Sequence, residues 1–196
     1  MATSTEDRHG EQRRQVRLNP EVRREQIVRE ATRLISEAGF NAMSLADVAD
    51  ACQIRKSSVL HYFPSMNDLL QAVLHARDRD EFGALGGLPH PLSPGEARVL
   101  FTEVLERNIE GREITRLYHI LAGEALSPQH PAHLYFVERS AASRTGLPRM
   151  LAWKRDPQAA ALQLSAFWQG IELEWLRDPH LDIRWAWNAF CDDFFD

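Results

Sequence analysis

Residues 44–63, SLADVADACQIRKSSVLHYF, decide the fold of this chain. Ser44 is a good N-terminal cap for a helix, and Asp47, three residues later, completes a carboxylate form of the capping box. Met43 and Val48 stand at the two positions that form a hydrophobic staple across such a cap. The stretch therefore predicts a short helix directly after Ser44, docked through its apolar face.

A second helix is predicted after a three-residue turn at 52–54. It spans residues 56–62, and Val59 and Phe63 fall on its buried side. Its other side carries residues whose side chains can reach base edges and phosphates in the major groove: Arg55, Lys56, Ser57, Ser58 and His61. The spacing predicts a helix-turn-helix motif whose second helix contacts DNA.

Helices are also predicted on both sides of this motif. Upstream, Asn19 caps a helix that has Pro20 at its first position and ends at Gly39. Downstream, Ser65 and Asp68 form another capping pair, which begins a fourth helix. The motif is thus expected inside a small bundle of three helices that leads directly into a longer one.

The run at 25–74 resembles the DNA-binding domain of the TetR family of bacterial transcriptional regulators. The matching segments are AGF at 38–40, SLADVADA at 44–51, HYF at 61–63 and FPSMNDLL at 63–70. The resemblance covers about 50 residues. It implies an all-helical, homodimeric, ligand-responsive regulator, and we expect a repressor that a small-molecule effector releases from DNA.

Three residues depart from the family pattern. Gln53 stands where these regulators usually have a glycine, because the turn favours a positive φ. Arg55 stands where a serine cap is common. Met66 replaces a lysine that often touches a phosphate. These departures bear on the strength and register of DNA contact rather than on the fold, and they leave open a helical adaptor that has lost specific DNA binding.

The resemblance also implies roles for individual residues. Arg55, Lys56, Ser57, Ser58 and His61 would read bases or the flanking backbone. Phosphates would be held by Ser44, Tyr62, Ser65 and Asn67, with help from Arg23 or Arg24 near the first helix. Because a two-fold dimer presents two such helices to one side of DNA, we expect a near-palindromic operator with half-sites about one helical turn apart.

The length and charge fit this organisation. The 196 residues suggest a disordered arm at 1–18, a helix-turn-helix domain at 19–64 and a ligand-binding and dimerisation domain at 65–196. The formal net charge is −5, but residues 1–64 contain ten Lys or Arg and nine Asp or Glu, whereas residues 65–196 contain thirteen and nineteen. DNA binding is therefore expected to depend on individually placed contacts more than on a broad basic patch.

The composition points to a bacterial cytoplasmic protein. No stretch approaches the roughly 20 apolar residues of a membrane span, and the N-terminus is charged, unlike a signal peptide. Cys52 and Cys191 fall in different predicted domains and suggest no disulfide framework. The arm is either a solvated tail or a basic segment that reaches DNA; its basic residues are Arg8, Arg13, Arg14 and Arg17.

Residues beyond the motif are predicted to be helical throughout, giving about nine helices and no strand. The fourth helix is expected from Met66 to about Gly83, followed by a Gly/Pro-rich loop at 83–95. Ser93 restarts a helix. Further helices are expected at 112–126, at 132–144 with a bend or break at Gly146 and Pro148, from the Asp156 cap to Arg177, and at 182–195.

The last two predicted helices carry aromatic and aliphatic residues at helical spacing. The first of them also has a second apolar face, so it needs a partner outside its own core. In the family this helix pair packs against its copy, which implies a dimer interface here. Its candidate residues are Leu164, Trp168, Ile171, Trp175, Ile183, Trp187, Phe190 and Phe194. An ordinary core edge is the alternative.

A small-molecule cavity is expected in the second domain, again by the resemblance. A mixture of aromatic and polar side chains would suit a mostly apolar, partly polar ligand of unknown identity. The candidate lining residues are His75, Phe82, Phe101, Tyr118, His119, Leu121, Glu124, Phe136, Arg139 and Phe167.

Other chemistry is not favoured by the sequence. His130 and His133 could share one helical turn, but no third metal ligand is evident nearby, so no metal or cofactor is expected. Cys52 at the turn could act as a redox switch, although a buried thiol is commoner. His61 and its neighbouring serines lack an orienting acid, and no other nucleophile–base pair or phosphate loop is visible, so an enzyme is not expected.

Overall fold

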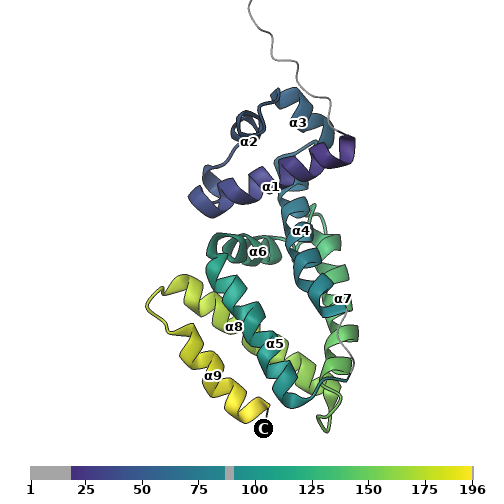
Figure 1. Ribbon diagram of the computed structural model, residues 1–196, viewed down its shortest axis with the longest axis vertical. Coiled ribbons are helices and arrows are strands. Elements are labelled where there is room, and N and C mark those ends of the chain that lie inside the picture. The colour runs from purple at the N-terminus through teal and green to yellow at the C-terminus, as the bar shows by residue number, and fades with distance from the viewer. Residues whose placement is uncertain (1–18, 87–90, 196) are drawn as a thin grey trace, which may run out of the picture.

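The computed structural model describes residues 19–86 and 91–195, and only the backbone of residues 80–86. Within these residues every regular element is a helix, which confirms the predicted all-α class (Figure 1). The arm predicted at 1–18 lies outside the described residues. None of the described helices is long and apolar enough to cross a lipid bilayer.

Three helices form a head at one end of the molecule. They are α1 (Pro20–Ala38), α2 (Leu45–Ala51) and α3 (Lys56–Tyr62), with a single 3-10 turn, η1 (Phe40–Ala42), after α1. The Asn19 side chain accepts a hydrogen bond from the Glu21 amide at 3.0 Å, and Gly39 ends α1 with a φ of 79°. The predicted start and stop of the first helix are thus confirmed.

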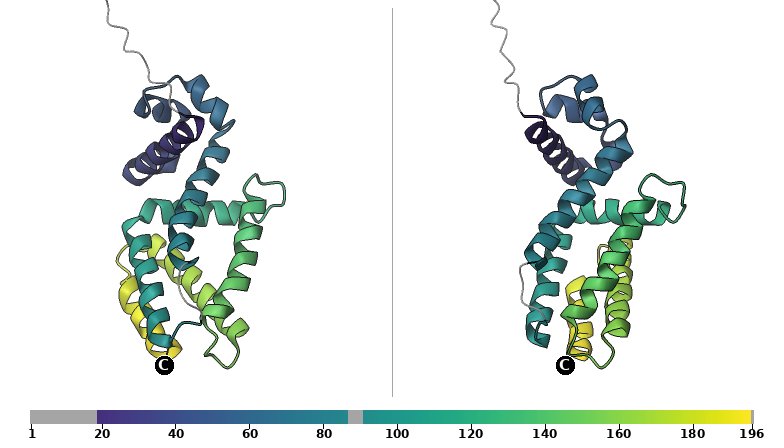
Figure 2. Two further views of the ribbon diagram at one scale, coloured as in Figure 1. Left: turned by 45° about the vertical axis from the view of Figure 1, so that its right-hand side comes forward. Right: turned by 90° about the vertical axis from the view of Figure 1, so that its right-hand side faces the viewer.

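Six longer helices form the rest of the structure. They are α4 (Met66–Gly86), α5 (Pro94–Glu110), α6 (Arg112–Glu124), α7 (His133–Met150), α8 (Pro157–Arg177) and α9 (Ile183–Phe194). Helix α4 leaves the head and runs into this larger part, and α6 lies crosswise between the head and the helices below it (Figure 1, Figure 2).

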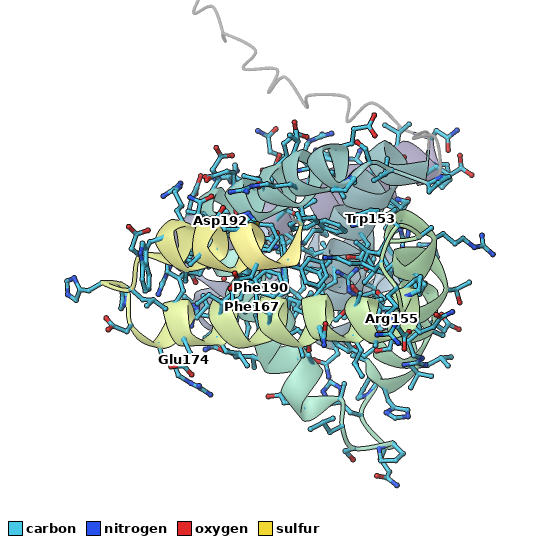
Figure 3. The ribbon with its side chains drawn as sticks, turned by 90° about the horizontal axis from the view of Figure 1, so that it is seen from below. Trp153, Arg155, Phe167, Glu174, Phe190 and Asp192 are labelled. Carbon is cyan, nitrogen blue, oxygen red and sulfur yellow. The ribbon has the colours of Figure 1, made fainter. Side chains whose placement is uncertain are left out.

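Two hydrophobic cores stabilise this arrangement. The first joins the head to the first half of α4 and to α6, since Ile27, Val59 and Leu69 are fully buried in the same cluster as Leu117. The second joins α5, α8 and α9. In that cluster the rings of Phe167 and Phe190 stack with centroids 3.9 Å apart, between two helices that lie side by side in Figure 3. The head is therefore docked on α6 as well as connected through α4.

Three predicted boundaries were wrong. Helix α4 continues to Gly86, three residues beyond the expected end, and α6 ends two residues early at Glu124. Helix α7 starts at His133 and runs without a break through Gly146 and Pro148 to Met150. Pro148 stands only two residues from the end of α7, so its missing N–H removes a hydrogen bond in the last turn and not in the middle of the helix.

Candidate functional site

The α2–turn–α3 unit is held by caps and a buried anchor. The Ser44 amide donates to Asp47 Oδ2 at 2.8 Å, and the Asp47 amide donates to Ser44 Oγ at 3.3 Å, which confirms the predicted capping box. Val59 is fully buried and Phe63 is 2% exposed, so α3 is fixed to the head through one side. The turn contains Gln53 at a φ of 55°.

The opposite side of α3 faces outward. Arg55, Lys56, Ser57 and His61 are exposed, whereas Ser58 and Tyr62 are half-buried. Helix α3 lies at the outer end of the head, at the far end of the molecule from α8 and α9 (Figure 1). Nothing in the described part of the chain covers this face, so it is open to a large partner.

Two arginines of α1, Arg23 and Arg24, were predicted to contact phosphates, and they differ in exposure and in the groups they contact. The Arg24 guanidinium stacks over the Phe63 ring at 5.0 Å, so it joins α1 to the end of α3 while the side chain stays exposed. Arg23 is half-buried and donates to Gln26 Oε1 at 2.5 Å within its own helix. Arg24 is therefore the better placed of the two to reach a ligand at α3.

The hydroxyls of the two cap serines, Ser44 and Ser65, are already hydrogen-bonded to carboxylates, which the sequence did not suggest. Ser44 Oγ donates to Asp47 Oδ2 at 2.7 Å, and Ser65 Oγ donates to Asp68 Oδ2 at 2.6 Å. The Ser44 hydroxyl and amide lower the pKa of Asp47 by stabilising its carboxylate. A phosphate would have to compete with a carboxylate for each hydroxyl. Asn67, also expected to hold a phosphate, is half-buried at the start of α4.

The larger part of the structure contains a pocket of about 530 Å³. That volume is within the range of about 300–1,000 Å³ that is typical of small-molecule sites. Helices α4 to α8 all contribute to its lining. One wall is apolar and includes Phe101, Val104, Leu164 and Trp168.

Polar side chains at one end of the pocket form a network that joins four helices. Glu172 of α8 is 2% exposed, and its carboxylate bonds Asn108 Nδ2 at 2.7 Å and His119 Nε2 at 2.8 Å. Asn108 Oδ1 in turn accepts from the Arg77 guanidinium at 2.6 Å. A buried carboxylate requires such donors, because desolvation disfavours its charged form. The network thus connects α4, α5, α8 and α6.

The ring of Tyr118 contacts two arginines of the same pocket. Arg77 and Arg139 stack on its ring, at 5.3 Å and 5.0 Å from the centroid. Arg139 also pairs with Asp78 of α4, which accepts a hydrogen bond from the Tyr135 hydroxyl at 2.6 Å. Burial and the bond to Asp78 raise the pKa of Tyr135. Helices α4 and α7 are thus held together by polar contacts next to the pocket.

The structure brings only some of the ligand-binding candidates together. Phe101, Tyr118 and Arg139 line the pocket, and His119 stands behind it as a partner of Glu172. Five other candidates do not line the pocket. Three are rings that pack on other rings: His75 on Tyr135, Phe136 on Tyr118 and Phe167 on Phe190. Leu121 lies in the first core, and Glu124 pairs with His130. The Phe82 side chain lies outside the described residues.

Sequence reasoning missed the polar residues that matter most here. Asn108 and Glu172 are both buried, and both interrupt otherwise apolar helix faces, with Leu105 and Ile109 near the first and Trp168 and Trp175 near the second. A polar residue within an apolar stripe was a detectable pattern, since buried polar groups occur where partners satisfy them. The partners themselves come from other helices and could not be read from spacing.

Five of the eight candidates for the dimer interface need correction, and the other three stay predictions. Leu164, Trp175, Ile183, Trp187 and Phe194 are each less than 9% exposed in the single chain, so they belong to its own core. Trp168, Ile171 and Phe190 are half-buried and pack against that core. The exposed large apolar side chains of these two helices are Leu162 and Trp185, at 71% and 68%. Helical spacing found the inner face of α8 and α9 and not the outer one.

The two cysteines are buried, and His130 and His133 each bond a backbone group. Cys52 and Cys191 are buried and free, and burial raises the pKa of both thiols. His130 accepts a hydrogen bond from the Ala132 amide at 3.2 Å, and His133 Nδ1 bonds the Ala125 carbonyl at 2.8 Å. Among the described residues no group of three or more His, Cys, Asp or Glu could hold a metal ion.

Comparison with known proteins relates the head to a described family and the whole fold to solved structures. Residues 27–73 match the sequence model of the bacterial regulatory proteins of the tetR family. No curated protein matches the chain at a significant level. Several solved structures do match, over most of the length of both chains.

Three of these structures illustrate the likeness. The multidrug binding protein EbrR, complexed with imidazole, is 24% identical with a TM-score of 0.63, covering 89% of this chain and 90% of that one. A protein from Rhodococcus sp. assigned to the TetR-family transcriptional regulators is 18% identical with a TM-score of 0.67, covering 89% and 100%. FadR of Thermus thermophilus, a TetR-family repressor in complex with lauroyl-CoA, is 17% identical with a TM-score of 0.55, covering 87% and 94%.

The two kinds of comparison agree with the geometry of the head. The matched segment begins in α1, contains α2 and α3, and ends in α4. This chain therefore carries, at residues 27–73, the N-terminal domain of the TetR family of bacterial regulatory proteins, and its described fold is that of TetR-family transcriptional regulators.

Proposed function

We propose that this protein is a transcriptional repressor that binds a near-palindromic operator as a homodimer and is released by a small molecule. The observation that carries the proposal is the exposed face of α3, which presents Arg55, Lys56, Ser57 and His61 at the outer end of the head. Arginine, lysine and serine are side chains that contact phosphates and base edges.

We assign contacts with DNA by two criteria: whether the side chain is exposed, and whether its polar group is already bonded to a carboxylate of the chain. Arg55, Lys56, Ser57 and His61 contact bases or the flanking backbone, and Arg24 contacts a phosphate beside the end of α3. Tyr62, half-buried at that end, is the next candidate. Ser44 and Ser65 act first as helix caps, because their hydroxyls are bonded to carboxylates.

The homodimer forms through the outer faces of α8 and α9. We call this surface the α8–α9 face and define it by Leu162, Ala166, Gly170, Trp185 and Ala189, which are all exposed in the single chain. Small residues let two helices approach closely, and exposed Leu and Trp side chains gain free energy when a partner covers them. A two-fold pairing there is the arrangement that lets two heads contact one DNA duplex.

The pocket is the effector site, and α4 and α6 connect it to the head. Helix α4 supplies Leu69 to the head core and Arg77 to the pocket, while α6 supplies Leu117 and Tyr118 to the same two places. The two conformations of the protein differ in the positions of α4 and α6 and therefore of the head. An effector that binds one conformation more tightly than the other increases the population of that conformation. DNA is then released because the two α3 helices no longer match the operator spacing.

The test is selection of bound fragments from the source genome by the purified full chain. The proposal predicts enrichment of a short near-palindrome whose half-sites lie about one helical turn apart. The double variant Arg55→Ala, Lys56→Ala should enrich nothing. An unpalindromic motif would contradict the dimer, and enrichment by the double variant would contradict the role of α3.

A second candidate is a helical adaptor of the same fold that has lost specific DNA binding. It is favoured by Gln53, whose φ of 55° strains the turn, and by Met66, which packs against the first core and offers no charge to a phosphate. Failure of the wild-type chain to retard any duplex at low salt would support this alternative.

A further inference from the structure

The pocket reaches the surface along one edge of α8. The residues of this helix that line the pocket differ in exposure: Ala161 and Glu172 are buried, whereas Leu162 and Gln169 are exposed. Leu162 is 71% exposed although it lines a cavity. The deep end of the pocket therefore lies at Glu172, and its mouth opens at Leu162 and Gln169.

The mouth and the α8–α9 face share one stripe of α8. Leu162, Ala166 and Gln169 follow one another at steps of four and three residues, so their side chains lie on the same side of the helix. Leu162 and Gln169 line the pocket, and Leu162 and Ala166 belong to the α8–α9 face. A molecule that covers the α8–α9 face therefore also meets the mouth of the pocket.

A second copy of this chain suits this surface, because the surface is uncharged. Residues 157–171 of α8 include no Asp, Glu, Lys or Arg, and the members of the face on α9 are Trp185 and Ala189. In a two-fold interface the same patch of each copy meets its equivalent, so a charge in the patch would lie near a like charge. Burying unpaired charges is costly, and an uncharged face avoids that cost.

We propose that a second copy of this chain completes the effector pocket: it packs on the α8–α9 face and also covers the mouth at Leu162 and Gln169. This inference rests on the proposed homodimer and effector site. A ligand in the pocket is then shielded from water at the mouth as well as at the deep end, so more of its apolar surface is buried in the dimer. Effector binding and dimerisation are thereby linked, because each favours the other by the same factor.

The first test measures whether the mouth is covered in the dimer. Gln169→Cys places a thiol at the mouth, and Val99→Cys places a control thiol at an exposed position of α5 that does not line the pocket. Each is made alone and together with Trp185→Arg and Ala189→Arg, a double change that leaves α8 intact and should give monomers. The parent chain, whose two thiols are buried, gives the background rate.

N-ethylmaleimide should modify the thiol at position 169 at least about tenfold more slowly in the dimer than in the monomeric double variant, because the reaction requires access to the thiol. The rate at position 99 should be the same in both forms, since α5 lies outside the α8–α9 face.

The second test measures the linkage with a neutral apolar probe, N-phenyl-1-naphthylamine, in a fluorescence titration. The dimer should bind the probe at least about tenfold more tightly than the monomeric double variant, or about 1.4 kcal/mol. Val99→Arg is the matched control, and it should bind the probe as wild type does because it changes neither the face nor the pocket lining. Saturating probe should also lower the dissociation constant of the wild-type dimer in sedimentation equilibrium, which needs no variant.

The outcomes that overturn this inference differ from those that overturn the proposed function. Equal labelling at position 169 in monomer and dimer, or equal affinity of both forms for the probe, contradicts the completed pocket and leaves the dimer standing. A double variant that remains dimeric contradicts the α8–α9 face and this inference together. Binding of the probe to neither form contradicts the effector site and this inference together. Protection and linkage in a chain that retards no DNA contradict the regulatory role alone.

Discussion

Gln53 holds the turn between α2 and α3 at a φ of 55°, a backbone conformation that residues with a Cβ adopt at a cost. The family resemblance predicted this conformation, because glycine is usual at the position, and the structure confirms it. The turn keeps its shape because both of its flanks are fixed: Val48 and Val59 are fully buried on either side. Strain at one residue is thus maintained by packing at its neighbours.

Replacing Gln53 with glycine is expected to stabilise the head. Release of about 1–2 kcal/mol of left-handed strain is partly offset by the greater freedom of glycine in the unfolded chain. Gln53→Gly should therefore raise the free energy of unfolding by about 0.5 kcal/mol, measured by urea denaturation. Gln53→Ala is the control, because it keeps the strain, and it should not stabilise the chain. A glycine variant less stable than the alanine variant would refute the strain.

The two thiols give a prediction about reactivity and pH. Burial raises the pKa of Cys191 to about 11 and that of Cys52 above its ordinary value, so little thiolate is present in the folded chain at pH 8. Neither thiol should react with a disulfide reagent at that pH until urea is added. Because burial raises the pKa of the folded-state thiol of Cys191, keeping that thiol protonated stabilises the folded chain. This stabilisation is fully present below pH 9 and is lost as the pH rises through 11.

Rapid labelling of the folded chain would contradict this burial. It would also revive the hypothesis that Cys52 is a redox switch, since a reactive thiol at the turn could change the position of α3. Labelling of Cys52→Ser and Cys191→Ser variants would show which thiol is responsible.

Helices α6, α7 and α3 have no side-chain hydrogen bond at their N-caps, and the shortest of the three is α3. Arg55 stands at its N-cap position, with no side-chain hydrogen bond to the helix, whereas α2, α5, α8 and α9 each have one. The helix is only seven residues long, so it depends on Val59 and Phe63 for its position. Arg55 does not cap α3, so its presence at this position is better explained by contact with DNA than by stabilisation of the helix.

Arg55→Ser is expected to separate stability from DNA affinity. A serine N-cap should raise the free energy of unfolding by about 1 kcal/mol. The same change removes a guanidinium from the exposed face and should weaken operator binding at least about tenfold, or about 1.4 kcal/mol. Urea denaturation and fluorescence anisotropy with a selected fragment measure the two effects. If affinity is unchanged while stability rises, Arg55 does not contact DNA.

Sequence patterns predicted the elements well where the cause is local. The caps at Asn19, Ser44 and Ser93 mark helix starts through side-chain bonds to residues two or three positions ahead. Patterns failed where packing overrides local preference. Helix α7 continues through Gly146, next to two residues that line the pocket, and it packs on α8, which no local rule predicts.

At the scale of the whole molecule, the sites depend on contacts between distant segments. Asn108 and Glu172 are 64 residues apart in sequence, and Arg139 and Asp78 are 61 apart. Spacing could identify apolar faces but not which face meets which helix, so it assigned Trp187 to a dimer interface when that residue is 1% exposed. The buried and exposed sides of α3 were predicted more accurately, because they follow from a single helical period.

The dimer is tested by changing only exposed residues. Gly170→Arg with Trp185→Arg introduces charge into the α8–α9 face without removing a core side chain, and should yield monomers in light scattering. Those monomers should bind the operator at least about a hundredfold more weakly, or about 2.8 kcal/mol, because one head must then bind alone. Val99→Arg is the matched control, since Val99 is an exposed apolar residue on α5. A dimer that survives the double change places the interface elsewhere.

The outward face of α3 is expected to contact DNA, and the salt dependence of operator binding measures that contact. The logarithm of the binding constant is measured against the logarithm of salt concentration for wild type and Lys56→Ala on one selected fragment. If Lys56 neutralises one phosphate in each protomer, the variant should bind more weakly to every fragment, with a slope smaller by about one per protomer. An unchanged affinity and slope would show that the outward face of α3 does not bind DNA through Lys56.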